Sequence, residues 1–187
     1  MVRIAVAFFA LALALPATAA QPPRVSISDY GQLKTPLPYP YDEAANASVQ
    51  TDQALAKAKA GKKLLLIKMG GNWCGDCRIL QATMDLPEMN AFLNRHYEMI
   101  SIDVGRMDKN LQVPARFGVK DKLEGVPAIL IVDPRSGKQL VARADVAALA
   151  DARHMTPRPW PTGWRNIRGR KQWPILSYNT SRPCTGG

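Results

Sequence analysis

Two cysteines separated by two residues are the part of the sequence best suited to chemistry. Cys74 and Cys77 lie in the run Trp73-Cys74-Gly75-Asp76-Cys77. At this spacing the two sulfurs can close a small disulfide ring or open to a dithiol. If the pair begins a helix, the unpaired N–H groups and the positive end of the helix dipole favour the thiolate form of Cys74. Because the thiolate is the species that attacks disulfides, the run predicts disulfide exchange.

A buried strand and a helix must position this pair. Leu64–Met69 is a nearly continuous apolar run typical of a buried strand, and Gly70–Asn72 is a turn. Arg78–Met84 contains no helix breaker and predicts a helix. Tyr97–Val104 is a second apolar run. A helix between two apolar strands is the βαβ pattern, so we expect these two strands to be parallel.

Caps and breakers predict the remaining elements. A helix over Ser48–Ala60, capped by Ser48 or Thr51 and ended by Gly61, precedes the first strand. The stretch Asp85–Glu88 starts another helix, with Pro87 near its first position. The further expected elements are an edge strand at Val25–Ile27, a helical turn within Val113–Val119, a strand at Ile129–Val132, its hairpin partner at Gln139–Ala142 and a helix over Ala144–Arg153.

The order of these motifs resembles the thioredoxin superfamily. Its signature is a strand, then Trp-Cys-x-x-Cys at a helix start, then a cis-proline before another strand. Pro127, within Gly125–Ala128, supplies the proline here, and the resemblance covers Val49 to Val141. It implies an α/β, thioredoxin-like fold, with a central mixed β-sheet and helices on both faces. It also implies a thiol–disulfide oxidoreductase that needs no cofactor and whose partners are protein thiols and disulfides.

The resemblance assigns roles to five residues near the cysteine pair. Cys74 would be the nucleophile, and the more buried Cys77 would resolve the mixed disulfide. Trp73 would offer a flat apolar surface to the substrate. Pro127, if cis, would place the Val126 backbone beside Cys74, where a substrate strand can pair with it.

Two positions depart from the common pattern of the superfamily. Gly75-Asp76 replaces the usual Gly-Pro between the cysteines, and a carboxylate there disfavours the thiolate and makes the dithiol more reducing. Lys68 stands where the superfamily usually buries an acid that relays protons, and Asp76 is its nearest substitute by sequence. A cation at Lys68 favours the thiolate, and if buried it could act as a neutral base. These two pKa-tuning residues oppose each other, and we favour the reductase direction.

The first twenty residues have the features of a signal peptide. Arg3 is a short positive region, Ile4–Leu15 is too short an apolar stretch to span a bilayer, and Ala17–Ala19 fits a cleavage site. An uncleaved N-terminal anchor is the alternative. Residues 1–20 therefore predict export to the periplasm with no stable membrane anchor after cleavage. An inner-membrane electron donor would then restore the dithiol.

The segments outside the central domain differ in character. Residues 21–47 are a proline-rich lead-in, and residues 48–154 form the thioredoxin-like domain. Residues 155–187 carry six of the 25 basic residues, no acid and three of the four tryptophans, and they lack the period of an amphipathic helix. The C-terminal helix expected of the fold is thus missing or replaced.

A shifted reading frame is one hypothesis for this tail. The codons of Pro159–Trp164, read from the third base, permit Leu-Ala-Asp-Trp-Leu, which suits a helix. The alternative is a genuine basic, aromatic arm that binds a membrane or a polyanion. Without the six basic residues of the tail the net charge of +10 falls to +4, so we predict no nucleic-acid binding. Cys184, also in the tail, is either incidental or forms a mixed disulfide or a dimer link.

Other roles for the cysteine pair fit the sequence less well. A zinc site needs about four ligands, and the sequence offers only one Cys-x-x-Cys with His96 and His154, so no metal is expected. A c-type haem needs a histidine where Arg78 stands. A purely structural disulfide would constrain little chain. The alternatives in function are a non-enzymatic thioredoxin-fold binding module and a disulfide oxidase or isomerase.

Overall fold

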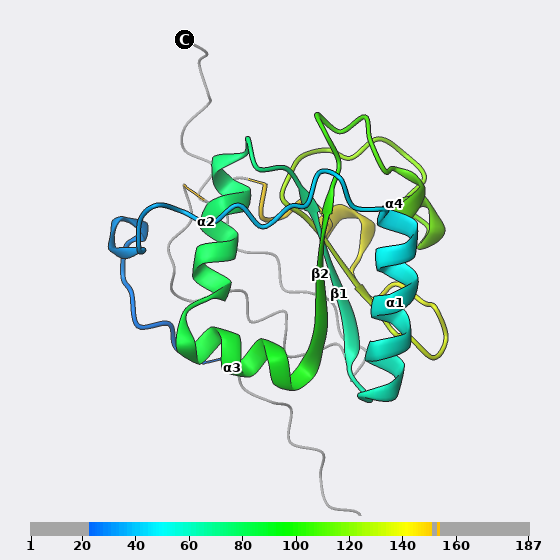
Figure 1. Cartoon of the computed structure of the whole chain (residues 1–187), viewed down its shortest axis with the longest axis horizontal. Coiled ribbons are helices and arrows are strands. Elements are labelled where there is room, and N and C mark those ends of the chain that lie inside the picture. Colours follow the sequence, from blue (N-terminus) through cyan, green and yellow to red (C-terminus); the bar gives the residue numbers. More distant parts are fainter. Residues whose placement is uncertain (1–22, 151–152, 154–187) are drawn as a thin grey trace, which may run out of the picture.

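A three-stranded mixed sheet forms the centre of the computed structural model, which describes residues 23–150 and 153 (Figure 1). Its strands are β1 (Leu64–Gly70), β2 (Tyr97–Asp103) and β3 (Ala128–Val132), in the order β2-β1-β3. The central strand β1 pairs in parallel with β2 and antiparallel with β3. The predicted mixed sheet and the parallel βαβ pair are therefore confirmed.

Helices cover the sheet from two sides, as Figure 1 shows. On one side lies α1 (Ala47–Ala60), and the short α4 (Gln112–Arg116) packs beside it. On the other side lie α2 (Gly75–Met84) and α3 (Pro87–His96). The thioredoxin-like α/β class predicted from the sequence is confirmed, and α2 is the helix that begins at the cysteine pair.

The start of α1 differs from the prediction. Asn46, not Ser48 or Thr51, is the N-cap, and its side-chain oxygen accepts hydrogen bonds from the N–H groups of Ser48 and Val49 at 3.1 Å. Thr51 is buried inside the helix, where its hydroxyl donates to Ala47 O at 2.7 Å. The helix begins at Ala47 because Asn46, still in extended backbone, is one of the best N-cap residues.

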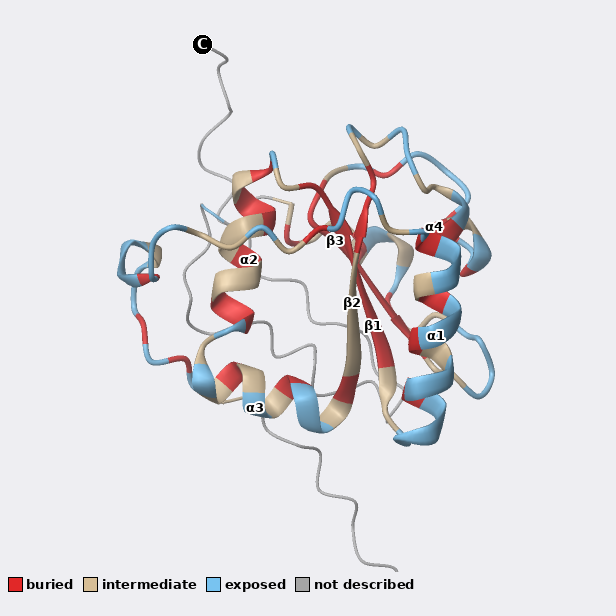
Figure 2. Cartoon of the chain, in the orientation of Figure 1, coloured by how far each residue is buried: buried red, intermediate tan, exposed pale blue. Residues whose placement is uncertain are grey.

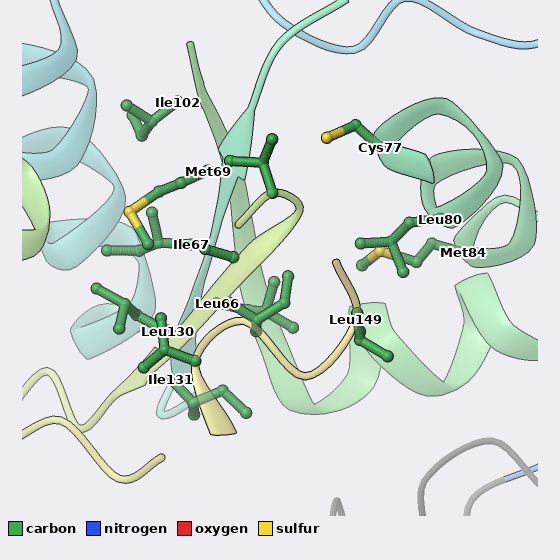
Figure 3. Packing of buried hydrophobic residues seen from close by; sticks show 14 of the residues in the cluster. Leu66, Ile67, Met69, Cys77, Leu80, Met84, Ile102, Leu130, Ile131 and Leu149 are labelled. Carbon is green, nitrogen blue, oxygen red and sulfur yellow. The ribbon is translucent and has the colours of Figure 1, made fainter. Parts of the chain in front are cut away.

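The core lies on both faces of the sheet. Figure 2 shows β1 and β3 as almost entirely buried, which agrees with an apolar run covered on two sides. In Figure 3 the side chains of Cys77, Leu80 and Met84 point from α2 toward the sheet. The second cysteine is thus one residue of the apolar stripe that attaches α2 to the core.

The predicted hairpin after β3 is only partly formed. The turn is present, since Asp133 N–H donates to Lys138 O at 2.9 Å. The expected strand Gln139–Ala142 is reduced to a single bridge between Val132 and Gln139. This part of the prediction was wrong because the chain leaves the sheet edge directly after that bridge.

The predicted helix over Ala144–Arg153 is also wrong for the residues that the structure describes. A 3-10 helix over Arg143–Asp145 is followed by turns up to Ala150. Burial of Val146 and Leu149 attaches this irregular segment to the core. Ile129 N–H donates to Val146 O at 2.7 Å, so backbone bonding to the edge strand competes with helix formation here.

The lead-in packs on the domain without forming the predicted edge strand. Val25 and Ile27 are buried in the core, yet their backbone belongs to no strand, and the first regular element is a 3-10 helix at Tyr30–Gln32. Ser26 N–H donates to the Glu88 carboxylate of α3 instead of to a neighbouring strand. In Figure 1 the lead-in runs from the α3 side along α2 and then across to α1.

Two predicted segments, the signal peptide at 1–20 and the tail at 155–187, lie outside the described residues. The codon hypothesis and Cys184 fall within them. Among residues 23–150 and 153, no helix has the length and apolar character needed to cross a membrane.

Candidate active site

The cysteine pair sits at the first turn of α2. Cys74 is the N-cap residue in extended backbone, and its sulfur accepts a hydrogen bond from the Cys77 N–H at 3.3 Å. Both cysteines are free thiols and both are buried, with Cys74 6% and Cys77 1% exposed. Helix N–H groups of Cys77 and Asp76 thus act on the first sulfur, while the second faces the core.

The surroundings of Cys74 stabilise its thiolate. The Cys77 side chain, followed by the Cys77 backbone N–H, hydrogen-bonds the sulfur and lowers the pKa of Cys74 to about 6, against burial and the charge of Asp76, which raise it. At this pKa about nine-tenths of Cys74 is ionised at neutral pH. The nucleophile for disulfide exchange is present without any added base.

The pKa of Cys77 moves in the opposite direction. Its hydrogen bond to Cys74 raises the pKa of the Cys77 thiol, and burial raises it further. The shared proton thus stays on Cys77, which donates it toward the Cys74 thiolate. Of the two buried sulfurs, Cys74 thus carries the negative charge and Cys77 keeps the proton.

The loop before β3 lies against the Cys74 sulfur. In its thiol form Cys74 donates to Val126 O at 3.5 Å, and the Val126–Pro127 peptide bond is cis. Val126 is otherwise buried. The structure therefore brings together Cys74, Val126 and Pro127, which the sequence predicted to share a substrate groove.

Trp73 borders the same site with a half-exposed ring. Its Nε1–H donates to Gly105 O at 2.8 Å, and the Arg106 guanidinium lies 4.2 Å from the ring centroid. A Cβ at Gly71 would come 2.4 Å from Nε1, so only glycine lets the indole fold back onto the turn. The rest of the side chain remains exposed, at 45% of its surface.

Asp76 is buried and paired. Arg153 donates its Nη2 to the Asp76 carboxylate at 2.7 Å, its Nε at 3.0 and 3.1 Å, and its backbone N–H at 2.8 Å. Such a fork is among the strongest side-chain contacts. The guanidinium offsets part of the negative charge that Asp76 would otherwise bring to the sulfurs, a contact that the sequence did not predict.

Lys68 is buried in the middle of the sheet, on the helix side that carries the cysteines. It pairs in register with Ser101 of β2 and Ile129 of β3. Burial lowers the pKa of Lys68 to about 8, although the charges of Asp85 and Cys77 act to raise it. The amine is thus an electrostatic neighbour of Cys77 that is partly neutral near physiological pH.

Tyr41 is a site residue that sequence reasoning missed. It belongs to the proline-rich lead-in, yet its hydroxyl lies beside the Cys77 sulfur. A Cβ built on Gly70 would be 2.5 Å from both Cys77 Sγ and the Tyr41 hydroxyl oxygen. The only sequence signal was an aromatic residue within an otherwise irregular segment, which by itself predicts packing.

The described residues offer no clear metal centre. Across 23–150 and 153, no three histidine, cysteine or acidic side chains come together in a way that could hold a metal ion.

Comparison with known proteins agrees with this geometry. A family model described as thioredoxin-like matches residues 45–134. The solved structure of a disulphide isomerase from Xylella fastidiosa Temecula1 is 36% identical in sequence, with a TM-score of 0.57, and the match covers 65% of this chain and 90% of that one. The chain belongs to the thioredoxin superfamily. Together with its Cys-x-x-Cys pair, this membership makes it a thioredoxin-like thiol–disulfide oxidoreductase.

Two more distant structures are also similar. Poplar thioredoxin h is 19% identical with a TM-score of 0.38, and the match covers 57% of this chain and 89% of that one. The oxidoreductase DsbH is 20% identical with a TM-score of 0.39, with coverage of 66% and 92%. A comparison with curated protein sequences gave no significant match.

Proposed function

We propose that this protein reduces disulfide bonds in other exported proteins through its Cys74–Cys77 pair. One observation carries the proposal above the others. The Cys74 sulfur is held as a thiolate at the start of α2, 3.3 Å from the N–H of a second cysteine that keeps its proton. This is the arrangement that attack on a disulfide followed by internal resolution requires.

The exchange proceeds in two steps. Cys74 attacks one sulfur of the substrate disulfide and forms a mixed disulfide, and the other substrate sulfur leaves as a thiolate. Cys77 then attacks Cys74, releases the second substrate thiol and closes the Cys74–Cys77 bond. An extended substrate segment would pair with the Val126 backbone beside Pro127 and pack on the exposed ring of Trp73.

The balance of charges around Cys74 favours reduction. Its pKa of about 6 lies closer to that of a reductant such as thioredoxin (~7) than to that of a strong oxidant (~3.5). Asp76 disfavours the thiolate, and a less stable thiolate makes the dithiol a better electron donor. Lys68 acts in the other direction, but its own charge is reduced by burial.

Export to the periplasm is part of the same proposal. The signal-peptide pattern of residues 1–20 supports it, and so does the presence of only three cysteines, which suit a working pair rather than a disulfide scaffold. In an oxidising compartment a reductase needs a supply of electrons. We therefore expect an inner-membrane electron donor to restore the Cys74–Cys77 dithiol.

The reduction potential of the pair tests the direction. A value near ~−270 mV, together with reduction of insulin disulfides, is expected for a reductase, and a value near ~−120 mV would show an oxidase. Cys74→Ser is the control and should lose insulin reduction. If Cys74→Ser retains full biological activity, the protein acts as a binding module and the proposal is wrong.

Isomerisation is the second candidate, because the relative with 36% identity is described as a disulphide isomerase. An isomerase needs the attacking cysteine but can dispense with the resolving one, since the substrate itself can break the mixed disulfide. Reactivation of a scrambled substrate by Cys77→Ser would favour isomerisation. Loss of that activity together with insulin reduction would favour the reductase.

A further inference from the structure

The Tyr41 hydroxyl is buried beside the resolving cysteine without a good hydrogen-bond partner. Tyr41 is 4% exposed, and its hydroxyl has no partner of suitable geometry among residues 23–150 and 153. Its oxygen and Cys77 Sγ both lie 2.5 Å from the Cβ position of Gly70, so they are close neighbours. A buried tyrosine hydroxyl normally has a partner, and an unsatisfied one costs stability. This hydroxyl therefore calls for an explanation.

The protein holds Tyr41 in this place by its backbone. Tyr41 N–H donates to Asn72 Oδ1 at 3.1 Å, and Asn72 Nδ2 donates to Tyr41 O at 2.8 Å. Asn72 belongs to the turn that leads into Cys74. Arg78 of α2 donates to Leu37 O at 2.7 Å and to Pro38 O at 3.1 Å. The active-site turn and the active-site helix thus both fix the lead-in where it passes the cysteines.

The protonation states limit what the hydroxyl can do. Burial, and after it the negative charge of Cys77, raises the pKa of Tyr41, so the phenol keeps its proton and can act as a donor. A neutral thiol is a weak acceptor, whereas a thiolate is a strong one. The pKa of Cys77 is raised mainly by its hydrogen bond to Cys74 and by burial, while Tyr41 acts to lower it. The hydroxyl gains a strong partner only when Cys77 ionises.

We propose that Tyr41 is a further catalytic residue, whose hydroxyl donates a hydrogen bond to Cys77 Sγ when this sulfur becomes negatively charged. The inference rests on the proposed disulfide exchange and names the group that assists its resolving step. Asp76, the substitute that the sequence offered for the missing acid, is already paired with Arg153.

The resolving step conserves atoms, protons and electrons. Cys77 loses its proton, and its sulfur attacks Cys74 Sγ of the mixed disulfide. The bond between Cys74 and the substrate sulfur breaks, and the Cys74–Cys77 bond forms. The substrate sulfur leaves with the electron pair and takes up one proton, which matches the one lost by Cys77. The cysteine pair is oxidised, the substrate is reduced, and Tyr41 keeps its own proton throughout.

Tyr41→Phe tests the proposal, with Tyr39→Phe as the matched control. Both changes remove one hydroxyl from the same segment, but Tyr39 is 66% exposed and its ring contacts Arg78. Thiolate absorbance is followed against pH in full-length protein carrying Cys74→Ser and Cys184→Ser, so that Cys77 is the only thiol. The charged neighbours Lys68 and Asp103 are the same in all variants. We expect Tyr41→Phe to raise the midpoint of Cys77 by about one pH unit and Tyr39→Phe to leave it unchanged.

A kinetic measurement checks the same point in the active pair. With Cys74 and Cys77 both present, Tyr41→Phe should slow the decay of the mixed disulfide about tenfold while the first attack by Cys74 keeps its rate. The variant should unfold at a temperature no lower than that of the wild type, because the change removes a buried hydroxyl that has no partner of suitable geometry among the described residues. Asn72→Ala, which releases the Tyr41 backbone, should shift the Cys77 midpoint in the same direction.

An unchanged Cys77 midpoint and an unchanged mixed-disulfide lifetime in Tyr41→Phe would overturn the proposal and leave Tyr41 as a packing residue. The titration needs no substrate. Its result is therefore separate from that of insulin reduction, which tests the proposed function.

Discussion

The mouth of the site and its floor treat two identical side chains in opposite ways. The mouth comprises Trp73, Cys74, Val126 and Pro127, and the floor comprises Tyr41, Lys68, Gly70 and Cys77. At the mouth, the neighbouring Cys77 thiol and then the helix N–H groups lower the pKa of the Cys74 sulfur. At the floor, the same hydrogen bond and then burial raise the pKa of the Cys77 sulfur. Although only three positions separate them at the start of one helix, Cys74 is ionised and can act as a nucleophile, whereas Cys77 remains a neutral thiol.

This difference teaches that one hydrogen bond between two identical side chains can shift their pKa values in opposite directions. It is the largest cause of both shifts, and the surroundings of each sulfur act together with it. The first turn of α2 presents its free N–H groups to Cys74, whereas Cys77 lies on the stripe that packs against the sheet (Figure 3). Changes at the mouth should therefore affect reactivity, and changes at the floor should affect resolution and stability.

The largest effect is expected from separating the two sulfurs. Cys74→Ser should lower insulin reduction by at least about 10³-fold, because the only ionised thiol of the pair is lost. Cys77→Ser should still attack substrate disulfides but should accumulate mixed disulfides, which are detectable by mass spectrometry. Accumulation of mixed disulfides in Cys74→Ser instead would reverse the roles of the mouth and the floor.

Lys68→Met should remove the free-energy cost of burying a charged amine at the floor. The pKa of Lys68 falls from 10.5 to about 8 on folding, so the folded protein binds fewer protons than the unfolded chain between these values. Stability therefore rises with pH across this window and is lowest below it. We expect Lys68→Met to be more stable at pH 7 by up to about 3 kcal/mol and to lose this rise.

Urea unfolding of the oxidised protein at several pH values measures the free energy of unfolding, and Lys57→Met, at an exposed position, is the control. If the free energy of unfolding rises with pH by the same amount in Lys68→Met and in Lys57→Met, Lys68 carries its charge in the folded protein at no cost.

Two glycine substitutions compare the rigidity of the floor and the mouth. Gly70→Ala places a methyl group 2.5 Å from Cys77 Sγ and the Tyr41 hydroxyl, both of which are buried, and should cost about 2 kcal/mol of stability. Gly71→Ala meets the Trp73 ring at 2.4 Å, but this half-exposed ring can turn outward, so the cost should be smaller. Thermal unfolding shows which variant loses more stability. Equal losses in Gly70→Ala and Gly71→Ala would contradict the expectation that the mouth adapts more easily than the floor.

The smallest effect is expected from Asp76→Asn. The charge of Asp76 raises the pKa of Cys74, so its removal should lower the pH midpoint for alkylation of Cys74 by a fraction of a unit. Asp85→Asn, at the far end of α2, is the control and should leave Cys74 unchanged. A higher midpoint in Asp76→Asn would show that the contact with Arg153, rather than the charge, sets the environment of the sulfur.

Much of the fold could be predicted because its signals are local. The apolar run of β1, the Pro87 start of α3 and the alternation of strand and helix each depend on residues that are neighbours in the chain. Predictions failed after β3, where Gln139–Ala142 forms one bridge and Ala144–Arg153 does not form the expected helix within the described residues. There, burial of Val141, Val146 and Leu149 holds an irregular segment, and burial of this kind has no periodic signature.

Local signals and long-range packing can also be separated within the site. The spacing of Cys74 and Cys77, the preceding strand and the later Pro127 were evident from the sequence, and these local motifs determined the superfamily and the exchange chemistry. The tertiary structure alone decided that Tyr41 reaches Cys77 and that Arg153 pairs with Asp76. Each of these contacts joins residues more than thirty positions apart and depends on how the lead-in and the last described residues pack on α2. A linear sequence specifies which groups can react, whereas packing specifies which of them meet.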